Sequence, residues 1–290
     1  MPELPEVELT VRDLKTKVLH RTFVDVWADT PKLIKKPSNF SDFKKGLKDK
    51  EIRDIFRLGK NILFKLSDNF ILLVHQKLTG HLLYGEWKRE GNEWVGLTKE
   101  LLDKMNRFLR VIFFLDNGKQ IGLSDLRKFA KIELIEEREL SDLPEIKEIG
   151  IDPFSKEFTF PKFKEIVSKN KRPIKVILTD QKLIAGIGNI YSSEILFDAR
   201  VHPLRKGNTL SERELKNLFK STKKLLKIGI KLGGASIPDY RRLDGSKGRF
   251  DKYRKVYRRE GKPCPRCKTP IKRIVIGGRS AYFCPYCQKL

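Results

Sequence analysis

The distribution of apolar residues divides the chain into a β-rich first half and a helical second half. After Pro5, apolar residues recur with the period of a helix, which predicts an amphipathic helix over residues 5–19. The members of this stripe are Val7, Val11, Leu14 and Val18. Short β-rich runs follow, separated by turn signals, at residues 22–26, 51–56, 61–66, 70–74, 111–115, 120–123 and 131–134. This pattern predicts a β-sandwich or barrel-like domain that ends near residues 150–153.

Turn chemistry and helical periodicity organise the remainder. Asp116-Asn117-Gly118 separates two β-rich runs and predicts a hairpin. Helices are expected over residues 160–169, 173–180, 190–199 and 211–231. The segment 233–249 is rich in glycine and charge, which predicts a mobile loop. The length of 290 residues is typical of about two domains, and no internal repeat or low-complexity tract is present.

The charge balance points to a polyanionic partner. Lys and Arg number 62 against 37 Asp and Glu, for a formal net charge of +25, and the pI is near 9.9. The charges are spread in short clusters, which suits a folded basic surface and favours nucleic acid over an anionic membrane. No apolar run approaches a membrane span and no signal-peptide pattern is present, so we expect no membrane association. The lysine richness favours a bacterial cytoplasm.

All four cysteines lie near the C-terminus in two Cys-x-x-Cys pairs. These are Cys264, Cys267, Cys284 and Cys287, with sixteen residues between the pairs. The spacing predicts one tetrahedral structural Zn²⁺, because each tight turn directs both of its thiolates to the same ion. Two disulfides are the alternative, and the lack of a secretory signal disfavours it. Between the pairs we expect strands over 271–276 and 280–283, with Arg279 directly after the Gly277-Gly278 turn.

The first residues carry candidate chemistry of another kind. If Met1 is removed, Pro2 becomes an N-terminal secondary amine with a pKa near 8, against roughly 10.4 for lysine. Such an amine attacks an aldehyde-like carbon to give an iminium that is already cationic. Glu3 and Glu6 lie close enough in sequence to move protons. The alternative is that Pro2 and Pro5 merely begin a helix, which is the simpler interpretation of this segment alone.

A second glycine-rich segment precedes a predicted helix. Gly186-Ile187-Gly188 is followed by Asn189, which we expect to be the N-cap of the helix at 190–199. A tight turn that leads into a helix N-terminus offers free backbone N–H groups to a phosphate. A plain turn between two helices is an equally good interpretation.

Together these residues resemble the formamidopyrimidine-DNA glycosylases of the MutM type, in the wider family that includes endonuclease VIII. The resemblance covers essentially the whole chain. It depends on five motifs in family order, which are Pro2-Glu3-Leu4-Pro5-Glu6-Val7-Glu8, Gly59-Lys60, Asp125-Leu126-Arg127-Lys128-Phe129, the segment from Gly186 to Glu194, and the terminal zinc finger. It implies an α+β fold in three parts. These are an N-terminal β-sandwich with its helix (1–150), a helix–two-turn–helix domain with a lesion loop (151–256), and a zinc-finger hairpin (257–290).

The resemblance implies a bifunctional DNA glycosylase and AP lyase that acts on oxidised purines in double-stranded DNA, as a monomer. Pro2 would attack C1′ and Glu3 would protonate the ring oxygen, before β- and δ-elimination. Lys60, Asn189 and Arg279 would hold phosphates near the lesion, with Lys171 a weaker candidate. Arg279 is also implicated in elimination. Glu6 would order the site through backbone amides, or simply be a first-turn carboxylate favoured by the helix dipole.

The resemblance also implies that three side chains fill the gap left by the extruded nucleotide. The matching positions are Leu78, Arg127 and Phe129. Phe129 would wedge between base pairs and Arg127 would meet the orphaned cytosine. Leu78 departs from the usual methionine, and Ala130 replaces a common glycine. A histidine that contacts DNA in many relatives has no clear match, because its region reads Arg107-Phe108-Leu109-Arg110.

Two alternatives remain open at this stage. One is a non-catalytic protein that binds damaged DNA, against which Pro2 and Glu3 argue because binding alone needs neither. The other is an endonuclease VIII-like enzyme for oxidised pyrimidines. The stretch from Asp244 to Phe250 favours the formamidopyrimidine type instead.

Overall fold

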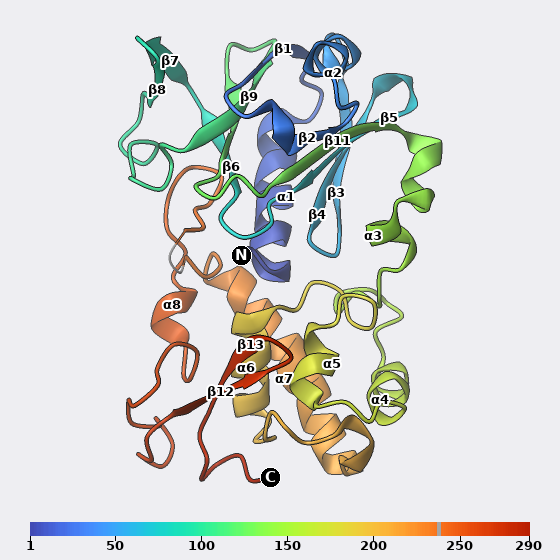
Figure 1. Cartoon of the computed structure of the whole chain (residues 1–290), viewed down its shortest axis with the longest axis vertical. Coiled ribbons are helices and arrows are strands. Elements are labelled where there is room, and N and C mark those ends of the chain that lie inside the picture. The colour runs from blue at the N-terminus through green and yellow to red at the C-terminus, as the bar shows by residue number, and fades with distance from the viewer. Residues whose placement is uncertain (237–238) are drawn as a thin grey trace. The chain divides into compact units, whose positions relative to one another are not determined.

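The structure, a computed structural model, describes residues 1–236 and 239–290. It divides into two compact units, of which unit 1 comprises residues 1–147 and 232–251 and unit 2 comprises residues 148–231 and 252–290 (Figure 1). The segment 232–251, predicted to belong to the helical domain, therefore groups with unit 1. The reason is that its hydrogen bonds reach α1 and β6, as when Tyr84 N donates to Leu243 O over 2.7 Å. The other predicted domain boundaries stay predictions.

Unit 1 is a β-sandwich of two sheets. The four-stranded sheet has the order β1-β9-β10-β6 and the five-stranded sheet the order β2-β11-β5-β4-β3. Their strands are β1 (Phe23–Ala28), β2 (Ile34–Lys36), β3 (Ile52–Leu58), β4 (Asn61–Leu66), β5 (Phe70–His75), β6 (His81–Gly85), β9 (Leu109–Leu115), β10 (Gln120–Ser124) and β11 (Lys131–Glu136). Every pair is antiparallel except β11 with β2. The predicted sandwich is confirmed, as is the α+β class.

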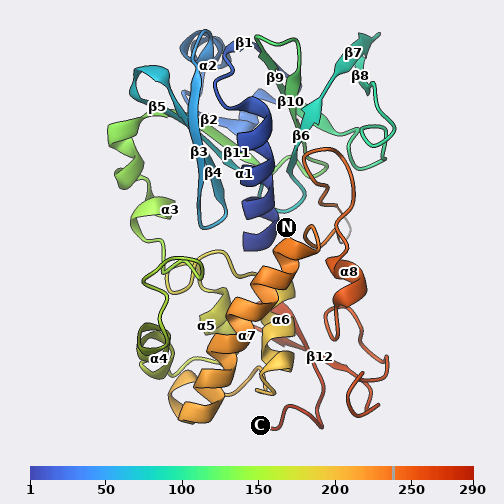
Figure 2. The same cartoon turned by 180° about the vertical axis from the view of Figure 1, so that it is seen from behind.

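Helix α1 (Leu4–Val18) closes the core of unit 1 (Figure 2). Its predicted apolar stripe is buried, and Val7, Val11, Leu14 and Val18 share one cluster with side chains of both sheets. Each of these residues is at most 5% exposed. At about 25 cal/mol per Å² of buried apolar area, this stripe, more than helix propensity, fixes the helix on the sheets. The packing places the N-terminus of α1, and with it the candidate chemistry, at a defined point of the sandwich.

The predicted hairpin at 116–118 joins β9 to β10, and Gly118 has φ +77° as its turn requires. The sequence pattern missed several short elements of unit 1. These are β2, β6, α2 (Phe40–Leu47), α3 (Pro144–Lys147) and the separate β7–β8 hairpin (Trp87–Glu90 with Glu93–Gly96). All of them have eight residues or fewer, so they carry little periodic signal.

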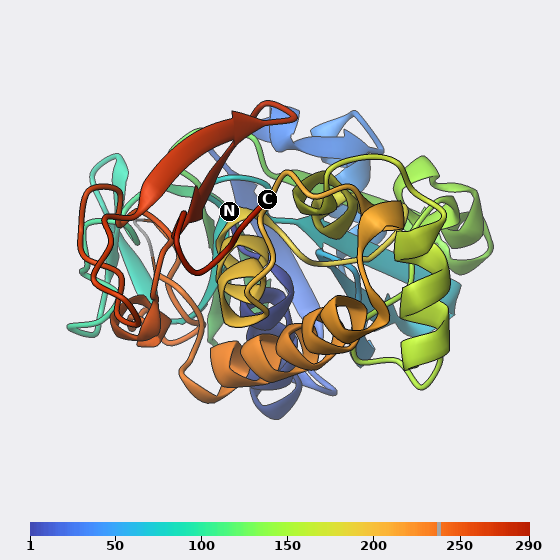
Figure 3. The same cartoon turned by 90° about the horizontal axis from the view of Figure 1, so that it is seen from below.

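Unit 2 contains the four helices expected from the sequence. They are α4 (Phe160–Ser168), α5 (Ile174–Thr179), α6 (Asn189–Asp198) and α7 (Glu212–Lys231). Helices α6 and α7 pack closely because Gly229 of α7 lies against Tyr191, where an added Cβ would overlap the hydroxyl oxygen (Figure 3). The short helix α8 (Phe250–Tyr253) contains the last point at which the chain passes from unit 1 to unit 2. The predicted terminal hairpin is present as β12 (Lys272–Ile276) and β13 (Arg279–Phe283).

Candidate active site

The N-terminal residues form a buried carboxylate pair at the start of α1. Pro2 is buried, and Glu3 and Glu6 are only 2% and 1% exposed. Glu3 is the N-cap of α1 and forms a reciprocal capping box with Glu6, whose Oε2 accepts the Glu3 amide over 2.9 Å. The helix dipole favours both negative charges at this end. The local sequence therefore holds Glu3 directly beside the predicted nucleophile Pro2.

Glu6 also fastens the 232–251 segment to α1. Its Oε1 accepts the Ala235 amide over 2.7 Å, and the Tyr240 hydroxyl donates to the Glu6 carbonyl over 3.3 Å. Gly234, with φ +81°, lies against the Glu6 side chain, where an added Cβ would be only 2.9 Å from Cγ and Oε1. The expected hydrogen bonds from backbone amides to Glu6 are thus present. A role for Glu6 in DNA binding stays a prediction, and residues 237–238 of the predicted mobile loop lie outside the described residues.

Lys60 lies close enough to the Met1 amino group for its charge to affect the pKa of that group. It occupies the two-residue turn between β3 and β4, in which Gly59 adopts φ +57°, and it is only 7% exposed. Burial lowers the pKa of the Met1 amino group, and the charge of Lys60 acts in the same direction. Glu3, Glu6 and Asp239 oppose the shift by favouring the protonated amine. Burial thus disfavours the protonated form of the Met1 amine, and a lowered pKa is the direction that makes an amine a better nucleophile.

The three predicted gap-filling side chains are exposed and come from two loops of unit 1. Leu78 is 38% exposed and Phe129 is 50% exposed. The Arg127 guanidinium lies 4.7 Å from the centre of the Phe129 ring. Leu126, in the same loop as Phe129, is also 44% exposed, so these loops present several apolar side chains, which suits a surface that contacts another molecule.

In unit 2, the predicted N-cap is wrong by one residue. Gly188 is the N-cap of α6 and Asn189 is its first helical residue. The reason is that Gly188 takes the extended conformation that an N-cap needs, after Gly186 has turned the chain with φ +86°. The Asn189 Oδ1 atom is buried without a hydrogen-bond partner in the part of the chain that the structure describes.

The remaining candidates of unit 2 surround α5. The Lys175 ammonium is buried and donates to the Asn189 carbonyl over 3.1 Å, and Arg279 Nη1 donates to the Thr179 carbonyl over 3.4 Å. Asn189 and Arg279 therefore each contact a residue of α5, one near its beginning and one at its end. Lys171 lies exposed just before this helix. The phosphate-binding roles of all three stay predictions.

The region without a clear histidine match contains two different arginines. Arg110 is paired with Asp29 over 2.7 Å and also donates to the Asp125 carbonyl over 3.1 Å. Arg107 is exposed, and its Nε donates weakly to the Leu102 carbonyl over 3.4 Å. Arg110 is thus committed to a structural network, and Arg107 is the more accessible of the two.

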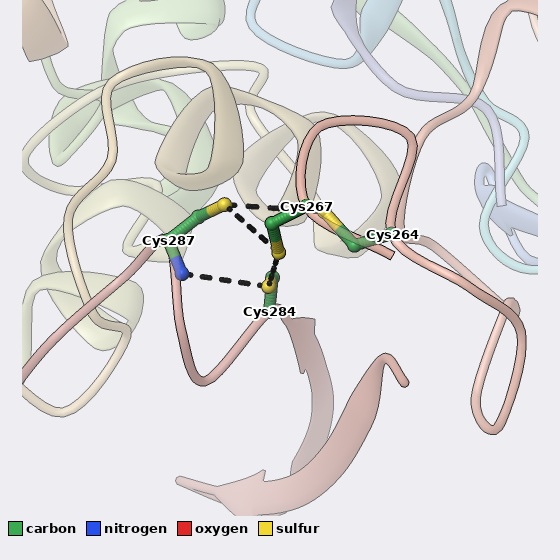
Figure 4. Close-up of side chains that lie close together, drawn as sticks. All are labelled: Cys264, Cys267, Cys284 and Cys287. Carbon is green, nitrogen blue, oxygen red and sulfur yellow. Dashed lines mark hydrogen bonds between the residues drawn. The ribbon is translucent and has the colours of Figure 1, made fainter. Parts of the chain in front are cut away.

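The four cysteine sulfurs converge as a metal site requires (Figure 4). All lie within 4.8 Å of one another, with Cys267 Sγ 3.4 Å from both Cys284 Sγ and Cys287 Sγ. A tetrahedral zinc with Zn–S bonds of about 2.3 Å would separate its sulfurs by roughly 3.8 Å. Burial and the adjacent Cys267 thiol raise the pKa of Cys287 to about 12, so a full set of thiolates needs a bound cation. The donor set therefore fits Zn²⁺.

Two buried ionic residues of unit 2 were missed as contributors to the site. The Glu194 carboxylate accepts the amides of Lys255, Val256 and Tyr257 over 2.8 to 3.0 Å, so it holds α6 to the chain that leads into the cysteines. Lys175 donates to the hydroxyls of Ser192 and Ser193 as well as to Asn189. Burial raises the pKa of Glu194. In the sequence, the only indication that Glu194 and Lys175 are buried is that each is a charged residue among the apolar residues of a predicted helix.

Comparison with known proteins identifies the family. Three family models match, namely the formamidopyrimidine-DNA glycosylase N-terminal domain over residues 1–132, the formamidopyrimidine-DNA glycosylase H2TH domain over 149–240, and a zinc finger found in FPG and IleRS over 261–290. A formamidopyrimidine-DNA glycosylase of Pelotomaculum thermopropionicum is 39% identical over 290 residues, which cover all of both chains. The chain belongs to the formamidopyrimidine-DNA glycosylase family. It is an enzyme of base excision repair, a DNA glycosylase with one structural zinc.

Solved structures of family members agree with this assignment. The Lactococcus lactis Fpg in complex with DNA containing an abasic site has a TM-score of 0.85 and 32% identity, with 99% of this chain and all of that chain covered. A mutant of the Lactococcus lactis protein, in complex with DNA containing Fapy-dG, has a TM-score of 0.86 and 32% identity, with both chains fully covered. The helix–two-turn–helix and zinc-finger parts of the predicted fold are thereby confirmed. No helix among residues 1–236 and 239–290 has the length and apolar character needed to cross a membrane.

Proposed function

We propose that this glycosylase removes oxidised purines, namely 8-oxoguanine and formamidopyrimidines, from double-stranded DNA and then cuts the strand. The Pro2 nitrogen, freed by removal of Met1, attacks C1′ of the extruded nucleotide. A new C–N bond forms as the glycosidic bond breaks, and the base departs with the electron pair and takes up a proton. The Pro2 nitrogen then gives its own proton to the Glu3 carboxylate and becomes a neutral tertiary amine. The complex of a mutant of the Lactococcus lactis relative with DNA containing Fapy-dG supports this substrate class.

Glu3 then moves the proton that opens the sugar. Its carboxyl group protonates the ring oxygen as the C1′–O bond breaks, which leaves a cationic iminium between Pro2 and C1′. Loss of a C2′ proton expels the 3′ phosphate by β-elimination, and δ-elimination then expels the 5′ phosphate. The single observation that carries this proposal is the buried arrangement of Pro2 and Glu3 at the N-terminus of α1, held by the capping box with Glu6.

The other candidates bind the strand and replace the extruded base. Lys60, Asn189 and Arg279 hold phosphates beside the lesion, with Lys171 a weaker candidate, because such contacts position a strand without reading its sequence. Leu78, Arg127 and Phe129 enter the duplex and offset part of the unstacking cost, which is a few kcal/mol per base step. Their exposure supports this role, since buried side chains cannot intercalate.

The decisive experiment is borohydride trapping on a duplex with 8-oxoguanine opposite cytosine. The protein whose N-terminus is verified by mass spectrometry as Pro2 is compared with a version that retains one extra N-terminal residue. A covalent adduct is expected only with free Pro2. No adduct from either, despite tight lesion binding, would leave a non-catalytic binding protein. An adduct from both would assign the attack to another amine, and preferential trapping on oxidised pyrimidines would favour the endonuclease VIII-like alternative.

A phosphate contact by Arg279 predicts a change in salt dependence. The logarithm of the binding constant falls with the logarithm of salt concentration by about 0.9 for each neutralised phosphate. Arg279→Ala should therefore weaken binding and lower this slope by about one. Fluorescence anisotropy at several salt concentrations measures it. Arg273→Ala, on the same hairpin with its Nε bonded to Ser280 Oγ over 2.9 Å, is the matched control. An unchanged slope for Arg279→Ala would exclude the contact.

A further inference from the structure

We propose that Asp125, acting with Thr79, is the positioning residue for all three side chains that fill the gap in the duplex. This inference rests on the proposed function. Asp125 is fully buried, and Thr79 is 6% exposed. Neither reaches the surface that Leu78, Arg127 and Phe129 present. Both therefore act through those three side chains and not on the DNA itself.

The Asp125 carboxylate organises the whole loop that follows it. Its Oδ2 accepts the amides of Phe129 over 2.7 Å and of Ala130 over 2.8 Å. Its Oδ1 accepts the amide of Arg127 over 3.2 Å. Hydrogen bonds to an ionised oxygen are about twice as strong as neutral ones. Two of the three gap-filling residues are thus anchored by their own backbone amides to one carboxylate.

The third gap-filling residue is attached through Thr79. The Thr79 hydroxyl donates to Asp125 Oδ1 and accepts the Arg127 amide over 3.0 Å. Leu78 directly precedes Thr79 in a tight turn closed by the Gly80 amide, which donates to the Gln76 carbonyl over 3.1 Å. Only glycine fits at position 80, because an added Cβ would overlap that carbonyl oxygen. One carboxylate and one hydroxyl therefore join two loops that are 46 residues apart in the chain.

This arrangement keeps the exposed side chains of Leu78 and Phe129 available to enter the duplex. An exposed leucine and an exposed phenylalanine gain free energy by folding back onto the protein, and a flexible loop would allow them to do so. Fixing the backbone on both sides of Phe129, and beside Leu78, prevents these side chains from folding back before the protein binds DNA. The conformational entropy of the two loops is then already lost on folding, so less binding free energy is lost when Leu78 and Phe129 enter the duplex.

Thr79→Val tests the inference because it removes the hydroxyl and keeps the shape. Each variant is assayed on two substrates, an 8-oxoguanine:cytosine duplex and a single-stranded oligonucleotide with an abasic site. Loss of hydrogen bonds to a charged group corresponds to about a tenfold effect or more. We expect that loss on the duplex, where a gap must be filled, and little change on the single strand, where there is none. Thr79→Ser, which keeps the hydroxyl, should restore the duplex rate.

Asp125→Asn provides the stronger variant, because the amide group that replaces one oxygen would face donors. Like Thr79→Val, it should lose activity on the duplex and little on the single strand, and its loss on the duplex should be larger. Equal losses of Thr79→Val on both substrates, or a Thr79→Ser variant as slow as Thr79→Val, would overturn the inference. A wild-type protein that cleaves neither substrate would instead overturn the proposed function, so the two failures are distinguishable.

A double-mutant cycle with Phe129→Ala separates positioning from general stability. If Asp125 works through the Phe129 side chain, whose amide it accepts, Asp125→Asn should cost less duplex activity once the Phe129 ring is gone. Additive losses in the double variant would contradict the inference. Thermal unfolding of all variants is recorded in parallel. The decrease in thermal stability caused by the substitution should be the same whether residue 129 is phenylalanine or alanine.

Discussion

Replacing Glu3 with glutamine is expected to slow strand cleavage by about 10²- to 10⁴-fold, the usual contribution of a positioned general acid. The glutamine side chain keeps the size of Glu3 and can still accept a hydrogen bond at the N-cap. It cannot deliver a proton to the sugar oxygen. Because Glu3 is only 2% exposed, bulk water is a poor substitute. Single-turnover kinetics on an 8-oxoguanine:cytosine duplex measure the effect, with binding followed separately by anisotropy.

Glu8→Gln is the matched control for this variant. Glu8 lies on the same helix and is bonded to Arg12 over 2.7 Å and to Arg57 over 3.0 Å, away from the capping box. Its substitution should lower stability by a small amount and leave the single-turnover rate near that of the wild type. A Glu3→Gln enzyme at full rate would show that the proton comes from elsewhere. Equal losses from both variants would show that the effect is one of helix stability.

The sequence predicted the main helices well. Helix α1 and helices α4 to α7 begin and end within one or two residues of expectation, because proline, glycine and polar residues flank their apolar segments. Elements such as β7 and β8 escaped notice, since a strand of four residues is too short to show a readable period. The α6 N-cap was misassigned because glycine and asparagine are both good caps, and only the backbone conformation decides between them.

The candidate site shows a different limit. Pro2, Glu3 and the cysteines were recognisable because their chemistry is local, in a short motif or a fixed spacing. The contacts that position them are not local. Glu6 meets Ala235 across 229 residues, and Asp125 meets Thr79 across 46. A single sequence gives no signal for such pairs, because neither residue is unusual in its own segment. Asp125 belongs to a recognisable motif, but its hydrogen bonds to Thr79 and to the loop amides are evident only in the folded chain.

Removal of the zinc is expected to abolish specific DNA binding. Cys264 and Cys284 are fully buried and share a small cluster with Phe197, Val256 and Ile271. The β12–β13 hairpin that carries Arg279 is only two strands, and an isolated hairpin of that size is marginal in water. Metal binding supplies about 10–16 kcal/mol in zinc-finger peptides, so the hairpin should lose its structure without the ion. Four thiols, two of them fully buried, then have no shared cation to satisfy them.

The experiment compares the zinc-loaded protein, a sample stripped with a chelator, and Cys264→Ser, with zinc content measured for each. We expect one zinc per chain, loss of anisotropy signal on an abasic-site duplex in the last two samples, and recovery when zinc is returned to the stripped sample only. Thermal unfolding should show that the β-sandwich of unit 1, which has its own core, survives the loss. Full affinity in a sample verified as metal-free would contradict the prediction. Loss of binding together with unfolding of unit 1 would mean that the ion stabilises more than the hairpin, because the effect would then reach a core to which no cysteine contributes.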